Sequence, residues 1–316
     1  MTVILTNVKM TIESESYIDA MHAVLTHKGW TTYSKPMLAG MTSAAFRFTV
    51  NRRLTAEGPT AYNWIAENFL AADFIGIAAS SNAGFTFDAT FPLYRDAAIL
   101  QIKKAIDDGT GAVIWKDRFV VAAGYDDERQ ILLLSNGREE EMEQLPYHSF
   151  GCNPYWYYQV LENRIPLDHL EVCRESLMQA VYRWETHDPM LPESEYACGK
   201  SAYAAITSAL QNGEYDREGW LAVIRSYAAS KQNIRSYFTV LETYWPSLRE
   251  AALQYARVAE ALEEMNRLVQ SDDMPAIERL IVLLDEACQA EEKAIMAIKL
   301  FMRETIDIRK GDIALR

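Results

Sequence analysis

The sequence contains no long apolar run. No stretch approaches the roughly 18 consecutive apolar residues that a membrane-spanning helix needs. Residues 1–16 include a short apolar patch, but they lack the basic start and the extended apolar stretch of a secretory signal peptide. These absences predict a soluble, cytoplasmic protein with no membrane partner.

Cysteine and histidine are scarce and scattered. None of the four cysteines forms a C-x-x-C pair, and their spacing does not match that of a zinc site. His22 and His27 are five residues apart in an expected helix, which places them about 140° apart around its axis. The stretch around Gly109 and Gly111 lacks the further glycine and lysine of a phosphate-binding loop. We therefore expect no metal and no cofactor, and the unpaired thiols fit a reducing compartment.

Basic residues are outnumbered by acidic ones. The 316 residues include 44 Asp and Glu but only 31 Lys and Arg, so the net charge is -13. A surface of this sign repels phosphate backbones, and nucleic acid is therefore not an expected partner. The chain is 49% hydrophobic and 24% charged, a composition typical of globular proteins with a sizeable core.

Residue patterns in the first half predict helices followed by an antiparallel meander. Apolar residues at helical spacing fill 17–28, and Gly29 is a natural stop. The residues 80–92 are small or turn-forming and predict a loop. Further expected elements are helices at 63–72 and 93–107 and strands at 46–50, 112–115, 118–123 and 130–134. This order predicts an α+β fold.

The second half changes in character after about residue 150, where strand signals disappear and helical patterns continue to the end. Ser247 and Glu250 form a capping box, which predicts the start of a long helix. A second long helix is expected after Pro275, and a short connection between the two predicts an antiparallel pair. We expect an α+β domain at 1–152 and an all-helical domain at 153–316 that ends in this helix hairpin.

Several segments together resemble a known family. They are YIDAMHAVL at 17–25, GMTSAAFRF at 40–48, the run from Ile106 to Glu128 that contains AVIWKDRFVVAAGYDDE, LSNG at 134–137, and CGKSAY at 198–203. The sequence is similar to the C39-like branch of the papain-like cysteine peptidases, in particular to its BtrH-type subgroup, named for a butirosin biosynthesis protein. The resemblance covers residues 12–150 and extends weakly to about 225. It implies a papain-like N-terminal domain with an antiparallel sheet.

The positions that carry the chemistry of that family are changed. The family's cysteine falls at Tyr17, give or take one residue, its histidine at Arg118, and its aspartate or asparagine at Asn136. A papain-type mechanism needs a thiolate and a histidine that takes and returns a proton. Arginine cannot act as that base, and the hydroxyl of Ser16 would have no base at the expected position. We therefore expect no peptidase activity.

The resemblance also suggests where a ligand would bind. Tyr17, Arg118 and Asn136 are expected to converge in one cleft, with Asp117 beside Arg118 at its mouth, where an arginine suits a carboxylate or another anion. Cys198 precedes Gly199 and an expected helix start, so its thiolate would be stabilised, unless the residue is only a small buried side chain.

Three functions remain open at this point. The first is a catalytically degenerate papain-like protein that binds a small molecule or peptide in the former active-site cleft. The second is a BtrH-like acyltransferase or hydrolase of a biosynthetic pathway, for which the sequence offers no identified nucleophile and base. The third is a structural or assembly protein that forms a homodimer through its C-terminal helices. The aromatic cluster at 155–158 would line a ligand pocket or pack between domains.

Overall fold

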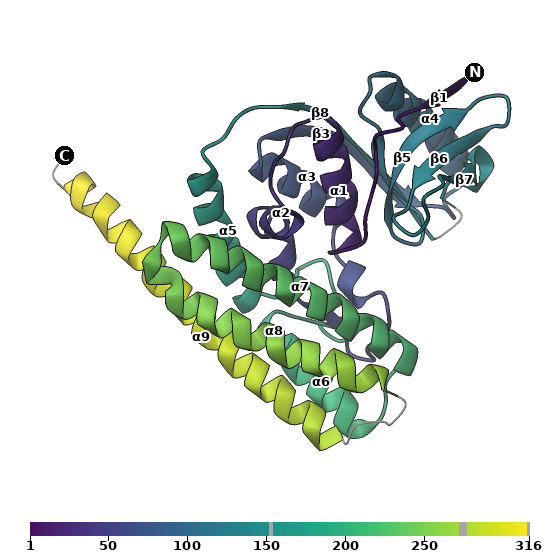
Figure 1. Cartoon of the computed structure of the whole chain (residues 1–316). Coiled ribbons are helices and arrows are strands. Elements are labelled where there is room, and N and C mark those ends of the chain that lie inside the picture. The colour runs from purple at the N-terminus through teal and green to yellow at the C-terminus, as the bar shows by residue number, and fades with distance from the viewer. Residues whose placement is uncertain (152–153, 272–276, 315–316) are drawn as a thin grey trace. The chain divides into compact units, whose positions relative to one another are not determined.

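The computed structural model describes residues 1–151, 154–271 and 277–314, with side chains up to residue 303 (Figure 1). Contacts divide the chain into two units. The first unit comprises Met1–Leu38 and Asn63–His169, and the second comprises Ala39–Tyr62 and Leu170–Arg316. This division differs from the expected one between residues 152 and 153, which themselves lie outside the described residues. A segment of the first half belongs to the second unit, and the first unit extends beyond the expected boundary.

Within the described residues, the first unit contains a seven-stranded sheet in which every pairing is antiparallel. The strand order is β3-β8-β4-β5-β6-β7, and β1 pairs with β5 outside this path. The strands are β1 (Thr2–Ile4), β3 (Ile77–Phe85), β4 (Ala112–Trp115), β5 (Phe119–Asp126), β6 (Ile131–Ser135), β7 (Glu143–Pro146) and β8 (Tyr155–Arg164). The expected antiparallel meander at 112–134 is therefore confirmed.

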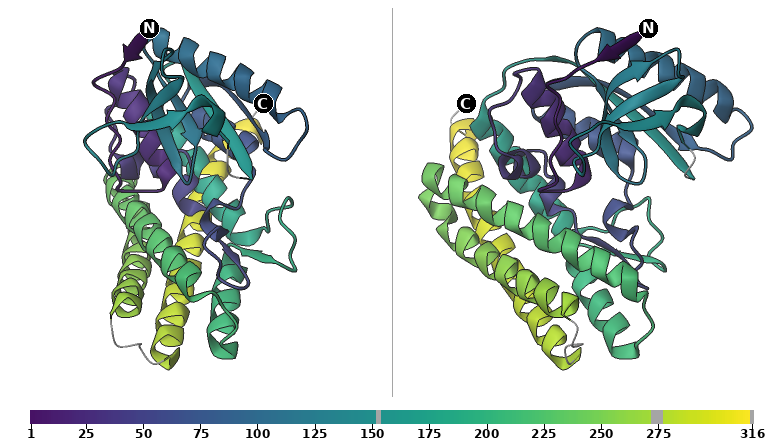
Figure 2. Two further views of the ribbon diagram at one scale, coloured as in Figure 1. Left: turned by 90° about the vertical axis from the view of Figure 1, so that its right-hand side faces the viewer. Right: turned by 45° about the vertical axis from the view of Figure 1, so that its right-hand side comes forward.

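The helices of the first unit pack on this sheet (Figures 1 and 2). They are α1 (Ser16–His27), α3 (Trp64–Phe74) and α4 (Phe91–Asp107), while α2 (Lys35–Met41) lies where the chain passes from one unit to the other. The helix α1 packs on β4 and β5 and buries Met21, Val24 and Leu25. Each of these side chains contributes about 1.5–3 kcal/mol when it is fully buried.

Four strands of this unit, β1, β3, β7 and β8, lie where the sequence predicts none, and so does β9 (Tyr196–Cys198) of the second unit. The strand β3 occupies much of the expected loop at 80–92, and β8 lies in the half that was expected to be all-helical. Residues 78–84 are Ala, Ser, Asn and Gly, which carry little intrinsic strand signal. Their strand is specified by pairing with β8 along its whole length, from Ile77 opposite Arg164 to Phe85 opposite Tyr155. Tertiary pairing therefore overrides local preference here.

The second unit is mainly helical. Its longer helices are α5 (His169–Glu185), α6 (Lys200–Asn212), α7 (Arg217–Tyr244), α8 (Arg249–Gln270) and α9 (Ile277–Ala314). Its shorter elements are the strands β2 (Thr49–Asn51) and β9 (Tyr196–Cys198), which pair antiparallel, and the 3-10 turns η1 (Ala44–Phe46), η2 (Gly58–Thr60) and η4 (Pro246–Leu248). The last two helices run antiparallel and side by side, as the sequence predicts (Figure 2).

Aromatic rings fill the centre of the second unit. Phe46 contacts the rings of Tyr237, Phe238 and Tyr255 at centroid distances of 6.2–6.3 Å. Gly40 lies so close to Tyr237 that a β-carbon at this position would overlap the ring. The segment Ala39–Tyr62 therefore packs against the C-terminal helices, which explains why it belongs to the second unit.

Candidate functional site

The start of α1 meets the tip of the hairpin between β4 and β5. The Oγ of Ser16, the first residue of the helix, accepts a hydrogen bond from the backbone N–H of Phe119 at 3.2 Å. Arg118, the last residue of the tip, is the direct neighbour of that N–H. The fold therefore brings two of the predicted site positions, 16 and 118, together across about 100 residues of sequence.

Tyr17 points into the core of the first unit. Only 2% of its surface is exposed, and its hydroxyl lies 2.9 Å from both the carbonyl oxygen of Asn68 and the Oε1 of Gln159. Its ring packs edge-on against Phe119 at 5.5 Å. The expectation that Tyr17 lines an open cleft needs correction, because the first turn of α1 directs Ser16 to the hairpin tip and Tyr17 to the interior.

Arg118 carries a buried group without a partner. Its side chain is half-buried, and among the described residues its Nη1 has no hydrogen-bond acceptor. Burial lowers the pKa of Arg118, and the nearby charge of Arg138 lowers it further, while Asp117 and Asp19 act in the opposite direction. A guanidinium remains charged at neutral pH even so. Leaving such a donor unsatisfied costs about 1–3 kcal/mol, and an anion is one kind of group that would satisfy it.

Asp117 does not supply that anion. Its Oδ2 lies 3.5 Å from the Nη1 of Arg138, and both side chains are more than half exposed. An exposed pair of this kind contributes about 0–1 kcal/mol. In the fold Asp117 is therefore an exposed partner of Arg138.

Asn136 supports the hairpin tip from the next strand. Its Oδ1 accepts from the backbone N–H of Arg138 at 2.9 Å, and its Nδ2 donates to the Oε2 of Glu143 at 3.1 Å. Glu143 also pairs with Lys116, which belongs to the tip that carries Arg118. Asn136 therefore lies near the site, but both ends of its amide are already occupied in holding a turn.

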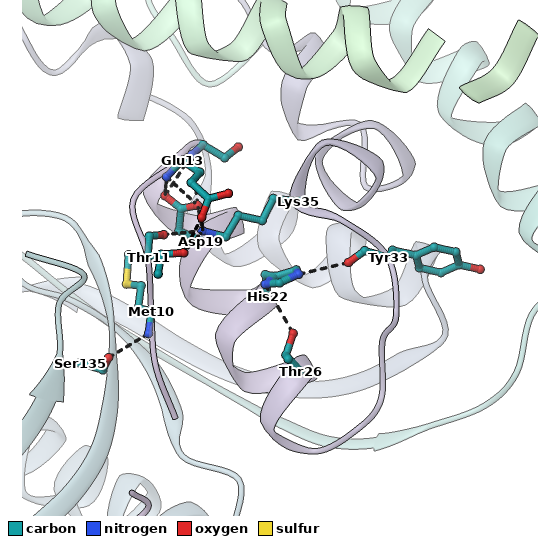
Figure 3. Close-up of polar contacts among 10 residues, drawn as sticks. Met10, Thr11, Glu13, Asp19, His22, Thr26, Tyr33, Lys35 and Ser135 are labelled. Carbon is teal, nitrogen blue, oxygen red and sulfur yellow. Dashed lines mark hydrogen bonds and ion pairs between the residues drawn. The ribbon is translucent and has the colours of Figure 1, made fainter. Parts of the chain in front are cut away.

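A buried ion pair at the start of α1 has no counterpart in the sequence-based predictions (Figure 3). Asp19 is fully buried and accepts from the backbone N–H groups of Glu13 and Ser14 at 3.1–3.4 Å. The Nζ of Lys35 lies 3.0 Å from Asp19 and donates to the carbonyl of Thr11 at 2.5 Å. Burial raises the pKa of Asp19 more than these partners lower it. The network fixes the segment that leads into Ser16, and its members are too far apart in sequence to give a local signal.

His22 is the histidine closest in sequence to this network. Its Nε2 lies 3.1 Å from the carbonyl oxygen of Tyr33, and Thr26 approaches its Nδ1 at 3.5 Å (Figure 3). Burial lowers its pKa, so the neutral ring is favoured. Both ring nitrogens therefore face the helix and the loop that follows it, which fits a structural histidine.

Cys198 belongs to the second unit and is buried. It ends β9, and its Sγ accepts from the Oγ1 of Thr49 at 3.6 Å. Burial raises its pKa, which is the opposite of what a stabilised thiolate requires. The alternative interpretation, a small buried side chain, is the one that fits this environment.

Neither a metal site nor a membrane-spanning helix is found in the part of the chain that the structure describes. No group of three or more His, Cys, Asp or Glu side chains there could hold a metal ion. No helix within the same residues is long and apolar enough to cross a membrane. The candidate site of the first unit is the junction of α1 with the hairpin tip, where Ser16 accepts the Phe119 N–H.

Comparisons with known proteins give this chain no family assignment. The sequence matches no family model and no curated protein.

Proposed function

We propose that this chain is a catalytically degenerate papain-like protein of the C39-like, BtrH-type group, and that it binds a small carboxylate-bearing molecule or peptide at Arg118. The topology supports this proposal. A helix start, a strand start and the end of the next strand meet near one hairpin tip, at Ser16, Arg118 and Asn136. The resemblance would place the catalytic residues at Tyr17, give or take one residue, at Arg118 and at Asn136.

The unpartnered Nη1 of Arg118 carries the proposal. Buried donors in native proteins nearly always have an acceptor, so one without a partner requires an explanation. Carboxylates bind guanidinium groups through two parallel hydrogen bonds, which suits a group that is partly enclosed. Arg138 also lies close by, although its charge is paired with that of Asp117. A ligand carboxylate at Arg118 would supply the missing acceptor.

Binding is favoured over hydrolysis by the same geometry. The Ser16 hydroxyl accepts the Phe119 N–H, and the residue beside it is an arginine that cannot accept a proton. Tyr17 is enclosed in the core and cannot reach a substrate. The site therefore has a means to hold an anion but no pair of groups that would activate a nucleophile.

Isothermal titration calorimetry with acetate and benzoate tests this proposal. We expect saturable binding by the unmodified protein and a loss of about tenfold or more in Arg118→Ala, the range for a charge-assisted hydrogen bond. Arg53→Ala removes an exposed arginine of the second unit and serves as the matched control. Equal binding by all three proteins, or hydrolysis of an acyl-thioester by the unmodified protein, would contradict the proposal.

A groove on the second unit favours an additional role in self-association. It has a volume of about 770 Å³, and its lining includes Met296, Leu300 and Phe301 of α9. Met296 and Leu300 are both more than half exposed. Exposed apolar surface of this kind is typical of protein contacts. Size-exclusion chromatography with light scattering would test this self-association. The unmodified protein should be a dimer, and Leu300→Glu should shift it to a monomer. A monomeric unmodified protein would exclude this role.

A further inference from the structure

Five aromatic rings form a continuous chain in the first unit, which we name the aromatic strip. From Trp115 the centroid distances are 4.5 Å to Trp64, 5.6 Å from Trp64 to Tyr155, 5.4 Å from Tyr155 to Phe85, and 4.9 Å from Phe85 to Phe87. Every step lies within the range of direct ring contact. The strip is therefore one connected surface rather than a set of separate side chains.

The strip crosses one end of the sheet. Phe85 ends β3 and pairs with Tyr155, which begins β8. Trp115 ends β4 and pairs with Phe119, which begins β5. Neighbouring strands lie about 4.8 Å apart, so the path from β3 to β5 measures about 14 Å. Trp115, at one end of the strip, directly precedes the hairpin tip that carries Arg118.

The three rings of the strip that are farther from Arg118 are more exposed than the two near it. Trp115 and Trp64 are half-buried, whereas Tyr155, Phe85 and Phe87 are exposed by 48%, 43% and 75%. Rings that serve only the core are enclosed, as Phe119 is in the same unit. A contiguous group of exposed rings marks a binding surface more often than a packing surface.

We propose that the aromatic strip binds the apolar body of the same ligand whose carboxylate binds Arg118. This inference rests on the function proposed above and specifies its ligand class. The ligand would be an extended molecule of about 14 Å, the length of some four extended peptide residues, with a carboxylate at one end. Aromatic or other apolar groups would follow along its length.

Charge complementarity supports this choice of ligand. The strip itself contains no charged side chain, while the tip beside Trp115 carries Arg118, and Arg138 and Asp117, which lie close to it, pair with each other. A molecule with one anionic end and an uncharged apolar body matches this distribution. A polyanion does not, because the chain as a whole carries a net charge of -13.

The test compares acetyl-Phe-Pro-Phe-Pro with a free carboxylate, the same peptide as its C-terminal amide, and acetate, each titrated calorimetrically into the full chain. The free acid should bind more tightly than acetate because it also contacts the rings. Phe87→Ala and Tyr155→Ala should each weaken the acid by about three- to tenfold, the range for a single ring contact, and leave acetate binding unchanged. About half of the Tyr155 surface and three quarters of the Phe87 surface are exposed, so the variants should fold.

Leu100→Ala is the matched control, because Leu100 is an exposed apolar residue of α4 outside the strip. The strip is excluded as a ligand surface if the peptide acid binds no more tightly than acetate, or if Phe87→Ala and Tyr155→Ala behave like Leu100→Ala. In either case acetate binding that depends on Arg118 would leave the proposed function standing. If the amide binds as tightly as the acid and Arg118→Ala changes nothing, the proposed function fails, and with it the carboxylate end of this inference.

Discussion

The fully buried Lys231 and the half-buried Arg118 lie in opposite surroundings. In the second unit, the Nζ of Lys231 is fully buried 2.6 Å from the Oε1 of Glu291, and Tyr203 donates to the other carboxylate oxygen at 2.7 Å. In the first unit, no described residue accepts from the Nη1 of Arg118. A buried charge satisfied by the chain itself holds its elements together. One left without an acceptor weakens the fold slightly and retains its capacity to bind.

The difference suggests that the Lys231 group stabilises the fold, whereas Arg118 serves binding. Lys231, Glu291 and Tyr203 come from α7, α9 and α6, so their bonds connect three helices of the second unit. Lys231 also lies 4.9 Å from the centre of the Phe48 ring. Removing any of these groups should therefore change stability, whereas removing Arg118 should change binding.

Ending the chain after residue 245 would break the satisfied arrangement completely. The truncation removes α8 and α9, which pack on α7 and α6, and it removes Glu291. Lys231 would lose its carboxylate while large apolar faces became exposed. We expect aggregation, measured by size-exclusion chromatography with light scattering. A truncated protein that remained monomeric with its full helical circular dichroism would contradict the assignment of these helices to the core of the second unit.

The single substitution Lys231→Met tests the same pair without removing a helix. It leaves the Glu291 carboxylate buried without its cation, which should lower the free energy of unfolding by about 3–5 kcal/mol. Urea unfolding followed by circular dichroism would measure this change. The double variant Lys231→Met with Glu291→Leu should lose less than the single variant, because no unpaired charge remains. A single variant as stable as the unmodified protein would show that the pair does not hold the helices.

A smaller effect is expected at the hairpin tip, from Glu143. Burial raises its pKa, but hydrogen bonds from Lys116 and Asn136 lower it more, and the folded pKa lies below the ordinary 4.5. The unfolded chain therefore binds more protons in this window, and stability present above about pH 4.5 is lost as the pH falls through the folded pKa. Glu143→Gln should flatten that part of the curve of unfolding free energy against pH. An unchanged slope between about pH 3 and 6 would contradict the pairing.

The sequence predicts those parts of the fold that have a regular local pattern. Apolar spacing in 17–28 locates α1, and the short apolar runs at 112–115, 118–123 and 130–134 locate the meander, whose strands are almost wholly buried. The strand β3 escapes prediction, since its small residues are defined by their pairing with β8. Strand pairing is a long-range property that a local pattern does not contain.

The candidate site is predictable only in part, for similar reasons. The resemblance locates the neighbourhood of Arg118, but it gives the start of α1 only to within one residue. That residue decides the side-chain direction, because Ser16 contacts the hairpin tip whereas Tyr17 points into the core. The Asp19–Lys35 pair joins residues without any local pattern between them. That the Nη1 of Arg118 is buried without an acceptor follows from the packing around it, and this cannot be predicted from the residue type alone.

The most direct test of the central claim is to measure unfolding and ligand binding together in Arg118→Met. Methionine retains much of the apolar stem and removes the unsatisfied donor. We predict that the free energy of unfolding stays the same or rises by up to about 1–2 kcal/mol, while calorimetric binding of benzoate is lost. A variant that loses several kcal/mol of stability, or that binds benzoate as tightly as the unmodified protein, would contradict the account.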